Sequence, residues 1–280
     1  MTRRAYLLGQ PVAHSLSPAL HNAAFSALGI DASYAALEVS LEDLPRVVDS
    51  LRASECYGAN VTAPHKQAVM SLLDEVGEEA LSLGAVNTIV NREGRLSGGN
   101  TDAAGLARWM RLSGIEAVGT SAVVLGAGGA ARSAVWALAD LGATSVVVLN
   151  RTVERAETLV TSLRPRLRTT DLMWGDLREA AEPARSPWRI IVNATSMGHH
   201  GSAPSVHPGW YSRESVAIEL AYNPPETGFM VAAREAGARA ENGLGMLLHQ
   251  AALAFERWTE QEPPMEVLEA VVAVRARTTR

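Results

Sequence analysis

A buried strand that runs directly into a glycine-rich turn constrains the fold more than any other feature of the sequence. Residues 121–125 have the apolar composition of a buried strand, a helix is expected to about Leu141, and residues 145–149 form the next strand. The turn after the first strand consists of Gly126, Ala127, Gly128, Gly129, Ala130 and Ala131. Glycines permit a tight turn and let the backbone approach a pyrophosphate at the helix N-terminus. This order of elements predicts a Rossmann-type dinucleotide-binding domain, and a merely tight turn is the less favoured alternative.

The residues that follow the second of these strands indicate which dinucleotide binds. NAD enzymes place an acidic residue there to hold the ribose hydroxyls, whereas this chain has Asn150, Arg151 and Thr152, followed by Arg155. A carboxylate would repel a 2′-phosphate, but the planar fork of an arginine can bind one. The sequence therefore favours NADP over NAD, and the alternative is that these arginines are exposed residues at the start of a helix.

Lys66 is the only lysine among the 25 lysine and arginine residues of the chain, and all the others are arginines. A guanidinium keeps its charge, whereas a lysine ammonium can pass a proton to a substrate, so one retained lysine suggests proton transfer; drift in composition is the alternative. Asn60 and Thr62 lie two residues apart at the end of an apolar strand and so face the same way. Pro64 suits the first turn of a following helix. An amide, a hydroxyl and an ammonium are thus expected together at one strand-to-helix corner.

The first half of the chain alternates between strand and helix patterns, which favours a mostly parallel sheet covered by helices. Ser17 and Pro18 form a helix-start signature, with the serine as cap and the proline in the first turn. A hairpin is expected around the polar turn at residues 91–94. Further strands are expected at residues 6–8, 34–39, 84–90, 188–192 and 216–220, and one more ends at Asn60. Helices are expected at residues 18–28, 41–51 and 243–258, in two segments between 66 and 84, and from 102 through 110. A last helix is expected after Pro264 and ends near Arg275.

Composition excludes several classes of function. The net charge of −5 disfavours nucleic acid and anionic membranes as partners, because both require a basic face. The single cysteine, Cys56, excludes an internal disulfide and suits a buried core thiol better than a nucleophile. His199, His200 and His207 match no metal-ligand spacing, so no metal is expected. The start of the chain lacks the apolar run of a signal peptide, which predicts a cytoplasmic protein.

Taken together, these motifs closely resemble the shikimate dehydrogenase family over essentially the whole chain. The resemblance rests on several separate motifs in the family's order. In the first half these are the segment containing His14, Ser15, Ser17, Pro18, His21 and Asn22, the motif from Asn60 to Lys66, residues 84–88, and Asn100-Thr101-Asp102. In the second half they are the glycine turn, the arginine segment, residues 193–198, Tyr222-Asn223-Pro224, and Gly245-Met246-Leu247 with Gln250. Glu219 departs from the family, in which an aspartate is expected ahead of the tyrosine motif.

The resemblance implies a role for each matching residue. Lys66 and Asp102 are the expected catalytic pair, and an exposed aspartate that caps the next helix is the alternative for Asp102. Ser15 and Ser17 are expected to hold the substrate carboxylate. The expected substrate-binding set is completed by Asn60, Thr62, Asn87, Tyr222 and Gln250. The expected NADP-binding set comprises Gly126, Ala127, Gly128, Gly129, Ala130, Asn150, Arg151, Thr152, Arg155, Thr195, Met197, Leu220 and Gly243.

The implied activity is the reversible NADPH-dependent reduction of 3-dehydroshikimate to shikimate by a monomer or homodimer. The implied architecture is two α/β domains with the active site in the cleft between them. A discontinuous substrate domain would comprise residues 1–102 and 243–280, and a Rossmann-type NADP-binding domain residues 103–242. Two alternatives remain: a quinate/shikimate dehydrogenase of broader specificity, and a non-catalytic sensor that binds a dinucleotide.

Overall fold

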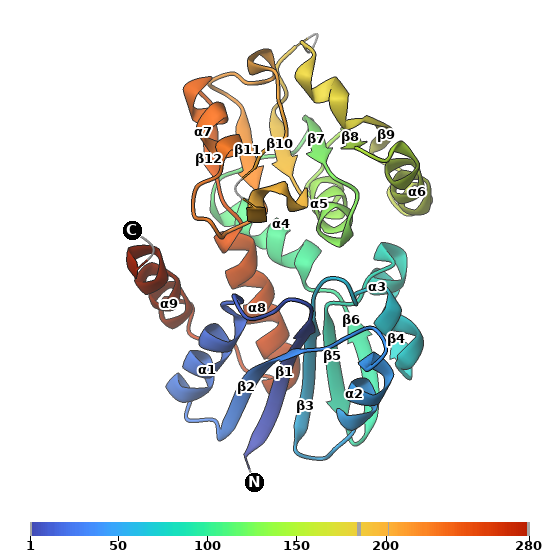
Figure 1. Cartoon of the computed structure of the whole chain (residues 1–280), viewed down its shortest axis with the longest axis vertical. Coiled ribbons are helices and arrows are strands. Elements are labelled where there is room, and N and C mark those ends of the chain that lie inside the picture. The colour runs from blue at the N-terminus through green and yellow to red at the C-terminus, as the bar shows by residue number, and fades with distance from the viewer. Residues whose placement is uncertain (1, 184–185, 201, 279–280) are drawn as a thin grey trace. The chain divides into compact units, whose positions relative to one another are not determined.

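The computed structural model describes residues 2–183, 186–200 and 202–278, with the side chains of residues 199–200 and 275–278 excepted. The described chain forms two compact units (Figure 1). The first combines Met1–Gly105 with Leu248–Arg280, and the second comprises Leu106–Leu247. Each unit contains one sheet of six strands, and the sheets have the orders β2-β1-β3-β5-β6-β4 and β12-β11-β10-β7-β8-β9. The fold is therefore α/β in both units, as the sequence predicts.

The sheet of the first unit is mixed. Its strands are β1 (Arg3–Gly9), β2 (Ala32–Glu38), β3 (Cys56–Val61), β4 (Glu75–Val76), β5 (Thr88–Arg92) and β6 (Arg95–Gly99). Strands β1, β2 and β3 are parallel to one another and β4 is parallel to β6, whereas β5 is antiparallel to both of its neighbours. The hairpin expected at residues 91–94 joins β5 to β6. Its two loop residues, Glu93 and Gly94, have positive φ angles of 53° and 83°, as a type I′ turn requires.

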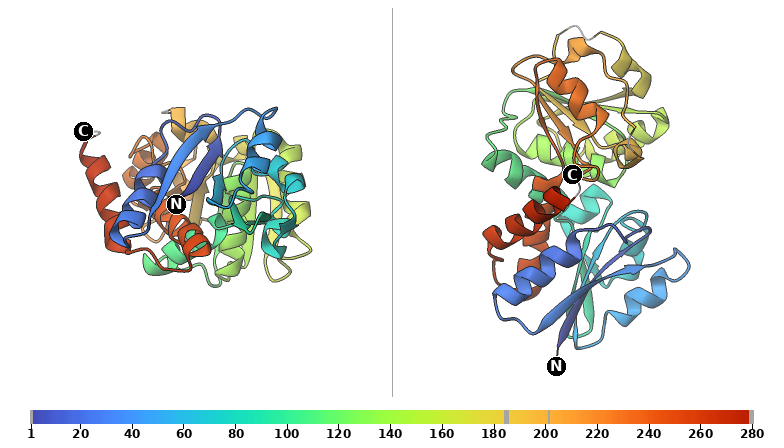
Figure 2. Two further views of the ribbon diagram at one scale, coloured as in Figure 1. Left: turned by 90° about the horizontal axis from the view of Figure 1, so that it is seen from below. Right: turned by 60° about the vertical axis from the view of Figure 1, so that its left-hand side comes forward.

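Helices cover both faces of this sheet. They are α1 (Ser17–Ala27), α2 (Leu44–Ser50), the 3₁₀ helix η1 (Ala68–Leu72), α3 (Glu78–Leu83), α8 (Leu244–Thr259) and α9 (Met265–Thr278). Leu44 and Val48 of α2 and Val69 of η1 pack with Cys56 and Ile89 in one buried cluster. The other face is aromatic, with Phe25 of α1 and Phe255 of α8 5.0 Å apart between ring centroids. Helix α9 lies beside α1 (Figure 2).

The sheet of the second unit is wholly parallel. Its strands are β7 (Ser121–Leu125), β8 (Ser145–Asn150), β9 (Asp171–Asp176), β10 (Ile190–Asn193), β11 (Val216–Glu219) and β12 (Arg239–Glu241). Alternate strand residues point to opposite faces. Val124 and Val148 pack with α4 (Asp102–Leu112), α5 (Gly129–Asp140) and α6 (Val153–Leu163) on one face. Val123 and Leu149 pack on the other face with α7 (Gly228–Glu235) and the 3₁₀ helices η2 (Leu177–Ala181) and η4 (Pro208–Trp210).

Helix α1 begins where the sequence predicts, with Pro18 in its first turn, but the expected cap at Ser17 and the expected helix start at Pro64 are wrong. Ser17 begins α1 but does not cap it; its own N–H donates to Ser15 Oγ at 3.2 Å, so the neighbouring serine supplies the side-chain acceptor. Pro64 does not lie in the first turn of a helix, because a turn occupies the residues after β3 and the 3₁₀ helix η1 begins only at Ala68. Strands β4, β9 and β12 and helix α7 were not expected from the sequence. Helix α6 was expected only in the alternative interpretation, in which Arg151 and Arg155 are exposed residues at the start of a helix.

Candidate active site

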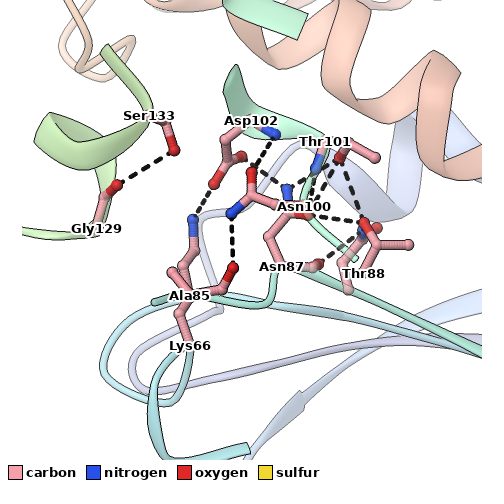
Figure 3. Close-up of polar contacts among 10 residues, drawn as sticks. Lys66, Ala85, Asn87, Thr88, Asn100, Thr101, Asp102, Gly129 and Ser133 are labelled. Carbon is pink, nitrogen blue, oxygen red and sulfur yellow. Dashed lines mark hydrogen bonds and ion pairs between the residues drawn. The ribbon is translucent and has the colours of Figure 1, made fainter. Parts of the chain in front are cut away.

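The Lys66 ammonium and the Asp102 carboxylate form a close ion pair in the first unit. Lys66 Nζ lies 2.5 Å from Asp102 Oδ2, and the two side chains are only 19% and 8% exposed. The other carboxylate oxygen, Oδ1, accepts a hydrogen bond of 2.8 Å from Asn87 Nδ2 (Figure 3). Lys66 is also fixed through its backbone, because its carbonyl oxygen accepts the N–H of Val86 at 2.8 Å. A titratable ammonium is thus held between a turn and a helix start, partly open to solvent.

Asp102 is the first residue of α4, yet its carboxylate does not cap that helix. Asn100 Oδ1 accepts the backbone N–H of Asp102 at 2.9 Å, while Asn100 Nδ2 donates to the carbonyl of Ala85 at 2.9 Å. Asn100 therefore ties the start of α4 to the chain that precedes β5 and leaves the Asp102 carboxylate for Lys66. The alternative of an exposed aspartate acting as a helix cap is wrong, because Asp102 is 6% exposed.

A buried hydrogen-bond network continues from Asp102 to β2. Asn87 Oδ1 accepts from the N–H of Thr101 at 2.7 Å and from Thr88 Oγ1 at 2.9 Å. Asn60 Nδ2 donates to Thr88 Oγ1 at 3.1 Å and to the carbonyl of Asn87 at 3.2 Å. Tyr34 OH donates to Asn60 Oδ1 at 2.9 Å. Both amide hydrogens of Asn60 are engaged within the protein, so a ligand can reach this amide only through its oxygen.

The hydroxyls expected to bind the substrate lie on two loops that follow neighbouring strands. The segment after β1 carries Ser15, which is half-buried, and leads to Ser17 at the start of α1, which is 5% exposed. Thr62 directly follows β3 and packs against Gly9, where an added Cβ would lie 2.3 Å from Thr62 Cγ2. Strands β1 and β3 pair in parallel, so their carboxyl ends bring both loops to the same edge of the sheet.

His21 of α1 is buried among aromatic rings. Its ring stacks on Tyr34, with centroids 4.4 Å apart, and tilts against Trp258 at 5.1 Å. Its Nε2 atom is buried and forms no hydrogen bond with any of the described residues. Burial lowers the pKa of His21 from 6.5 to about 3, against a smaller opposing effect of the nearby Asn60 side chain. Burial likewise raises the pKa of Tyr34 well above 10.0. Both rings are therefore neutral at physiological pH.

Gln250 of α8 lies close to the start of α4. A Cβ added to Gly105 would meet the backbone N of Gln250 at 2.6 Å, so the two helix backbones touch there and only glycine fits. Gln250 is 8% exposed, and this contact lies three residues along α4 from Asp102. The structure therefore brings Gln250 into the same unit as Lys66, Asp102, Ser15, Ser17, Asn60, Thr62 and Asn87.

The glycine turn of the second unit has room for a phosphate-bearing ligand. Gly126 has a φ of 107°, a conformation that favours glycine, and an added Cβ would lie 2.9 Å from the carbonyl oxygen of Ala194. Gly128 precedes α5, and a Cβ there would meet nothing within 4 Å. No side chain in the described part of the chain caps α5, so the N–H groups of its first turn are available to an anion. Ala127, Gly129 and Ala130, the other residues expected to bind the pyrophosphate, belong to the same turn and the start of α5.

Two arginines lie beyond the end of the neighbouring strand, β8. Arg151 and Arg155 are exposed, and neither forms an ion pair with another residue in the described part of the chain. Asn150 Nδ2 donates to the carbonyl of Thr152 at 2.8 Å, which shapes the turn between β8 and α6. Two guanidinium groups without a carboxylate partner are suited to a 2′-phosphate.

The other residues expected to bind the cofactor follow β10 and β11 at the carboxyl edge of the same sheet. Thr195 and Met197 lie after β10, and Leu220 lies after β11. Gly243 packs directly on Leu220, because an added Cβ would lie 2.1 Å from the carbonyl oxygen of Leu220. The turn at Gly126 touches Ala194, so these segments converge at one edge. Tyr222 is half-buried on the segment after β11.

No group of three or more potential metal ligands occurs among the described residues. His207 instead caps the 3₁₀ helix η4, where its Nδ1 accepts the N–H of Gly209 at 3.0 Å. The side chains of His199 and His200 lie outside the described residues. Within the described chain, no helix is both long and apolar enough to cross a membrane.

Several polar residues of these networks were missed from the sequence. Thr88 and Thr101 flank expected site residues and could have been found by their position. Tyr34 belongs to an ordinary strand pattern, and no local signal indicates that its hydroxyl reaches Asn60, 26 positions away. Glu219 stood out as a departure, but its burial was not expected; it is fully buried.

Three protein-family patterns match the sequence. The shikimate dehydrogenase substrate binding domain matches residues 7–89, shikimate / quinate 5-dehydrogenase matches residues 112–196, and the shikimate 5′-dehydrogenase C-terminal domain matches residues 243–273. A curated relative, shikimate dehydrogenase (NADP(+)) of Carboxydothermus hydrogenoformans, is 40% identical, with 98% of this chain and 97% of the relative covered.

Two solved structures are similar over nearly the whole chain. The shikimate 5-dehydrogenase of Thermus thermophilus in complex with NADP(H) and shikimate is 38% identical, with a TM-score of 0.86, and 99% of this chain and 100% of that one are covered. The quinate dehydrogenase of Corynebacterium glutamicum in complex with NAD is 30% identical, with a TM-score of 0.89 and coverage of 98% and 99%.

Proposed function

Because the chain belongs to the shikimate dehydrogenase family, we propose that it reduces 3-dehydroshikimate reversibly to shikimate with NADPH and that Lys66 transfers the proton. The observation that carries the role of Lys66 is its ion pair with Asp102, which lies in a nearly buried polar network. In 280 residues no other lysine is available for proton transfer. The ion pair orients the ammonium, and its partial exposure leaves it accessible to a substrate.

The reaction adds a hydride to the carbonyl carbon of the substrate and a proton to its oxygen. When bound, NADPH supplies the hydride. The carbonyl oxygen gains negative charge as the carbon is reduced, and the Lys66 ammonium both stabilises that charge and donates the proton that completes the hydroxyl. In the reverse direction neutral Lys66 accepts the proton. Asp102 holds the ammonium in place and accepts a hydrogen bond from a substrate hydroxyl.

The polar groups around Lys66 suit a small polyhydroxy acid. We propose that the hydroxyls of Ser15 and Ser17 bind the carboxylate, and that Thr62, Asn60, Asn87 and Gln250 bind or orient the ring hydroxyls. Tyr222 of the second unit is proposed as a further substrate-binding residue. A site whose buried polar groups need partners rejects analogues that lack them. Asn87 Nδ2 donates one hydrogen bond to Asp102 and one to Thr101, so a substrate that replaces Asp102 as the acceptor also weakens the hold on Asp102.

We propose that the second unit binds NADP. The glycine turn and the first turn of α5 receive the pyrophosphate, and Arg151 and Arg155 bind the 2′-phosphate. Asn150, Thr152, Thr195, Met197, Leu220 and Gly243 line the remainder of the cofactor site. Residues 103–242 then form the NADP domain, and residues 1–102 with 243–280 form the substrate domain. A cytoplasmic monomer or homodimer is part of the proposal, and light scattering after gel filtration tests the oligomeric state.

The direct test is the initial rate of NADP reduction by the purified protein with shikimate, compared with quinate and with NAD. We expect fast turnover only with shikimate and NADP. Turnover that is faster with quinate and NAD would favour the broader quinate/shikimate enzyme, because a quinate dehydrogenase is among the similar structures. NADP binding without turnover for any pairing would favour a sensor.

The role of Lys66 is tested with Lys66→Ala. We expect kcat to fall by roughly a hundredfold or more while the Kd of shikimate changes little, because general acid catalysis supplies about 10²–10⁴ in rate. Arg46→Ala removes a cation that is 78% exposed and serves as the matched control. A Lys66→Ala enzyme with near-native kcat would show that the proton comes from elsewhere.

A further inference from the structure

The carboxylate of Glu219, at the end of β11, is the centre of a buried hydrogen-bond cluster in the second unit. Oε2 accepts from Asn193 Nδ2 at 2.7 Å and from Thr227 Oγ1 at 3.0 Å, and Oε1 accepts from the backbone N–H of Ala221 at 3.1 Å. Glu219 and Asn193 are both fully buried. Such a carboxylate joins the ends of two strands and the residue that precedes α7.

Asn193 links the Glu219 carboxylate to Thr195 through hydrogen bonds. Because Asn193 Nδ2 faces Glu219, its Oδ1 faces the opposite way and accepts from the Thr195 backbone N–H at 3.1 Å and from Thr195 Oγ1 at 2.8 Å. The carboxylate accepts hydrogen bonds but cannot donate one, so only one orientation of the Asn193 amide fits. Glu219 thus sets the position of Thr195 through a single intervening side chain.

The same carboxylate also supports the far end of the segment after β10. A Cβ added to Gly198 would lie 3.1 Å from both Glu219 oxygens and 3.0 Å from Ala221 Cβ, so the backbone of Gly198 rests directly on the cluster. Residues 193–198 are therefore held at both ends by Glu219. On its other side the bond to Ala221 fixes the turn that joins Leu220 to Tyr222.

A glutamine at this position could not serve all three donors. If its amide nitrogen replaced Oε2, it would face Asn193 Nδ2, and Asn193 would have to reverse and withdraw its oxygen from Thr195. If its nitrogen replaced Oε1, it would face the N–H of Ala221. In either orientation a buried donor loses its acceptor, whereas an aspartate would keep two accepting oxygens.

We propose that Glu219 is a positioning residue for NADP binding that holds Thr195 and the turn at Ala221 in their binding conformations. The inference rests on the proposed function, in which Thr195, Met197 and Leu220 contact the cofactor. Glu219 itself touches neither substrate nor cofactor.

The experiment compares wild type, Glu219→Gln and Glu219→Asp by titration with NADP alone and by steady-state kinetics. For Glu219→Gln we expect the Kd of NADP to rise roughly tenfold to a hundredfold, because a hydrogen bond to a charged group is lost. The KM of shikimate at saturating NADP should rise by a smaller factor than the Kd of NADP, because only Tyr222 among the proposed substrate-binding residues lies beside the turn that Glu219 supports. Glu219→Asp should restore most of the affinity for NADP. Glu235→Gln makes the same charge change on the exposed end of α7 and should match wild type.

A Thr195→Val substitution tests the link through Asn193. It should weaken NADP binding in wild type but much less in Glu219→Gln, because Thr195 is already displaced there. Should Glu219→Gln fail to fold, Asn193→Ala cuts the same link and should raise the Kd of NADP similarly.

Native NADP affinity in Glu219→Gln, equal losses for NADP and shikimate, or failure of both variants to fold would overturn the proposal. Measurements on the wild type distinguish an overturned role of Glu219 from a failure of the proposed function. A wild type that binds NADP but does not turn over shikimate would contradict the proposed activity, while the titrations would still decide the role of Glu219.

Discussion

Replacement of Asp102 by asparagine should impair catalysis far more than a lost helix cap would. An asparagine side chain at this position could not satisfy both of its neighbours. With its oxygen toward Lys66, its amide would face Asn87 Nδ2; with the amide reversed, two donors would meet at Lys66. Asn87 cannot reverse to compensate, because its own oxygen accepts from Thr101 and Thr88.

The size of the effect follows from the geometry of the pair. At 2.5 Å and an effective dielectric constant of about 20, the attraction between the two charges is about 7 kcal/mol, most of which offsets their desolvation. Removal of one partner of such a poorly exposed pair typically costs about 3–5 kcal/mol of the free energy of unfolding. Because Lys66 also loses its orientation, we expect kcat to fall by roughly a hundredfold or more.

Urea unfolding and steady-state kinetics measure the two effects on one preparation. Asp140→Asn is the matched control, since Asp140 pairs with Arg111 at 3.0 Å on the surface, where both side chains are more than half exposed; it should cost about 1 kcal/mol or less. If Asp102→Asn lost only about 1 kcal/mol and kept kcat within a few fold, Asp102 would behave as a helix cap and the reasoning would be refuted.

Two further predictions concern the cofactor and pH. Arg151→Ala should weaken NADP binding much more than NAD binding, because only NADP has a 2′-phosphate; equal losses in a binding titration would exclude that contact. His21 should make the protein less stable in acid. Its pKa is 6.5 when unfolded and about 3 when folded, so below 6.5 the unfolded chain takes up a proton that the folded chain does not. The free energy of unfolding should fall by about 1.4 kcal/mol per pH unit, or about 2 kcal/mol at about pH 5. His21→Phe keeps the stacked ring and should lose that much less on the same change; identical losses in urea unfolding would contradict the assignment.

The elements that strong local patterns define could be predicted from the sequence. The apolar run at residues 121–125 coincides with β7, and the hairpin turn before β6 needed only its polar residues and Gly94. Helix α6 has buried residues at regular helical spacing and could have been predicted in the same way. Strands β4 and β12 are two and three residues long, too short to show an alternation, and exist only because a neighbouring strand pairs with them.

The partners of the site residues were harder to predict than the residues themselves. Asn60 and Lys66 were expected at one corner, but their contacts come from chain segments far away in sequence. The pairing of Lys66 with Asp102 spans 36 positions and was expected only from the resemblance to the family. The bond between Tyr34 and Asn60 spans 26 positions and depends on the parallel register of β2, β1 and β3, which no local pattern specifies.

Because Cys56 is buried, the rate at which its thiol reacts can report local opening of the first unit. Cys56 is the only cysteine in the chain, is 3% exposed and begins β3 in the centre of the first sheet. Burial also raises the pKa of its thiol, which lowers the fraction of reactive thiolate. A thiol reagent can therefore reach Cys56 only when the surrounding strands separate, and the rate of labelling under native conditions measures how often that occurs. Shikimate should slow this labelling if it binds only the conformation in which these strands stay paired. Thiol labelling can then detect ligand binding without turnover.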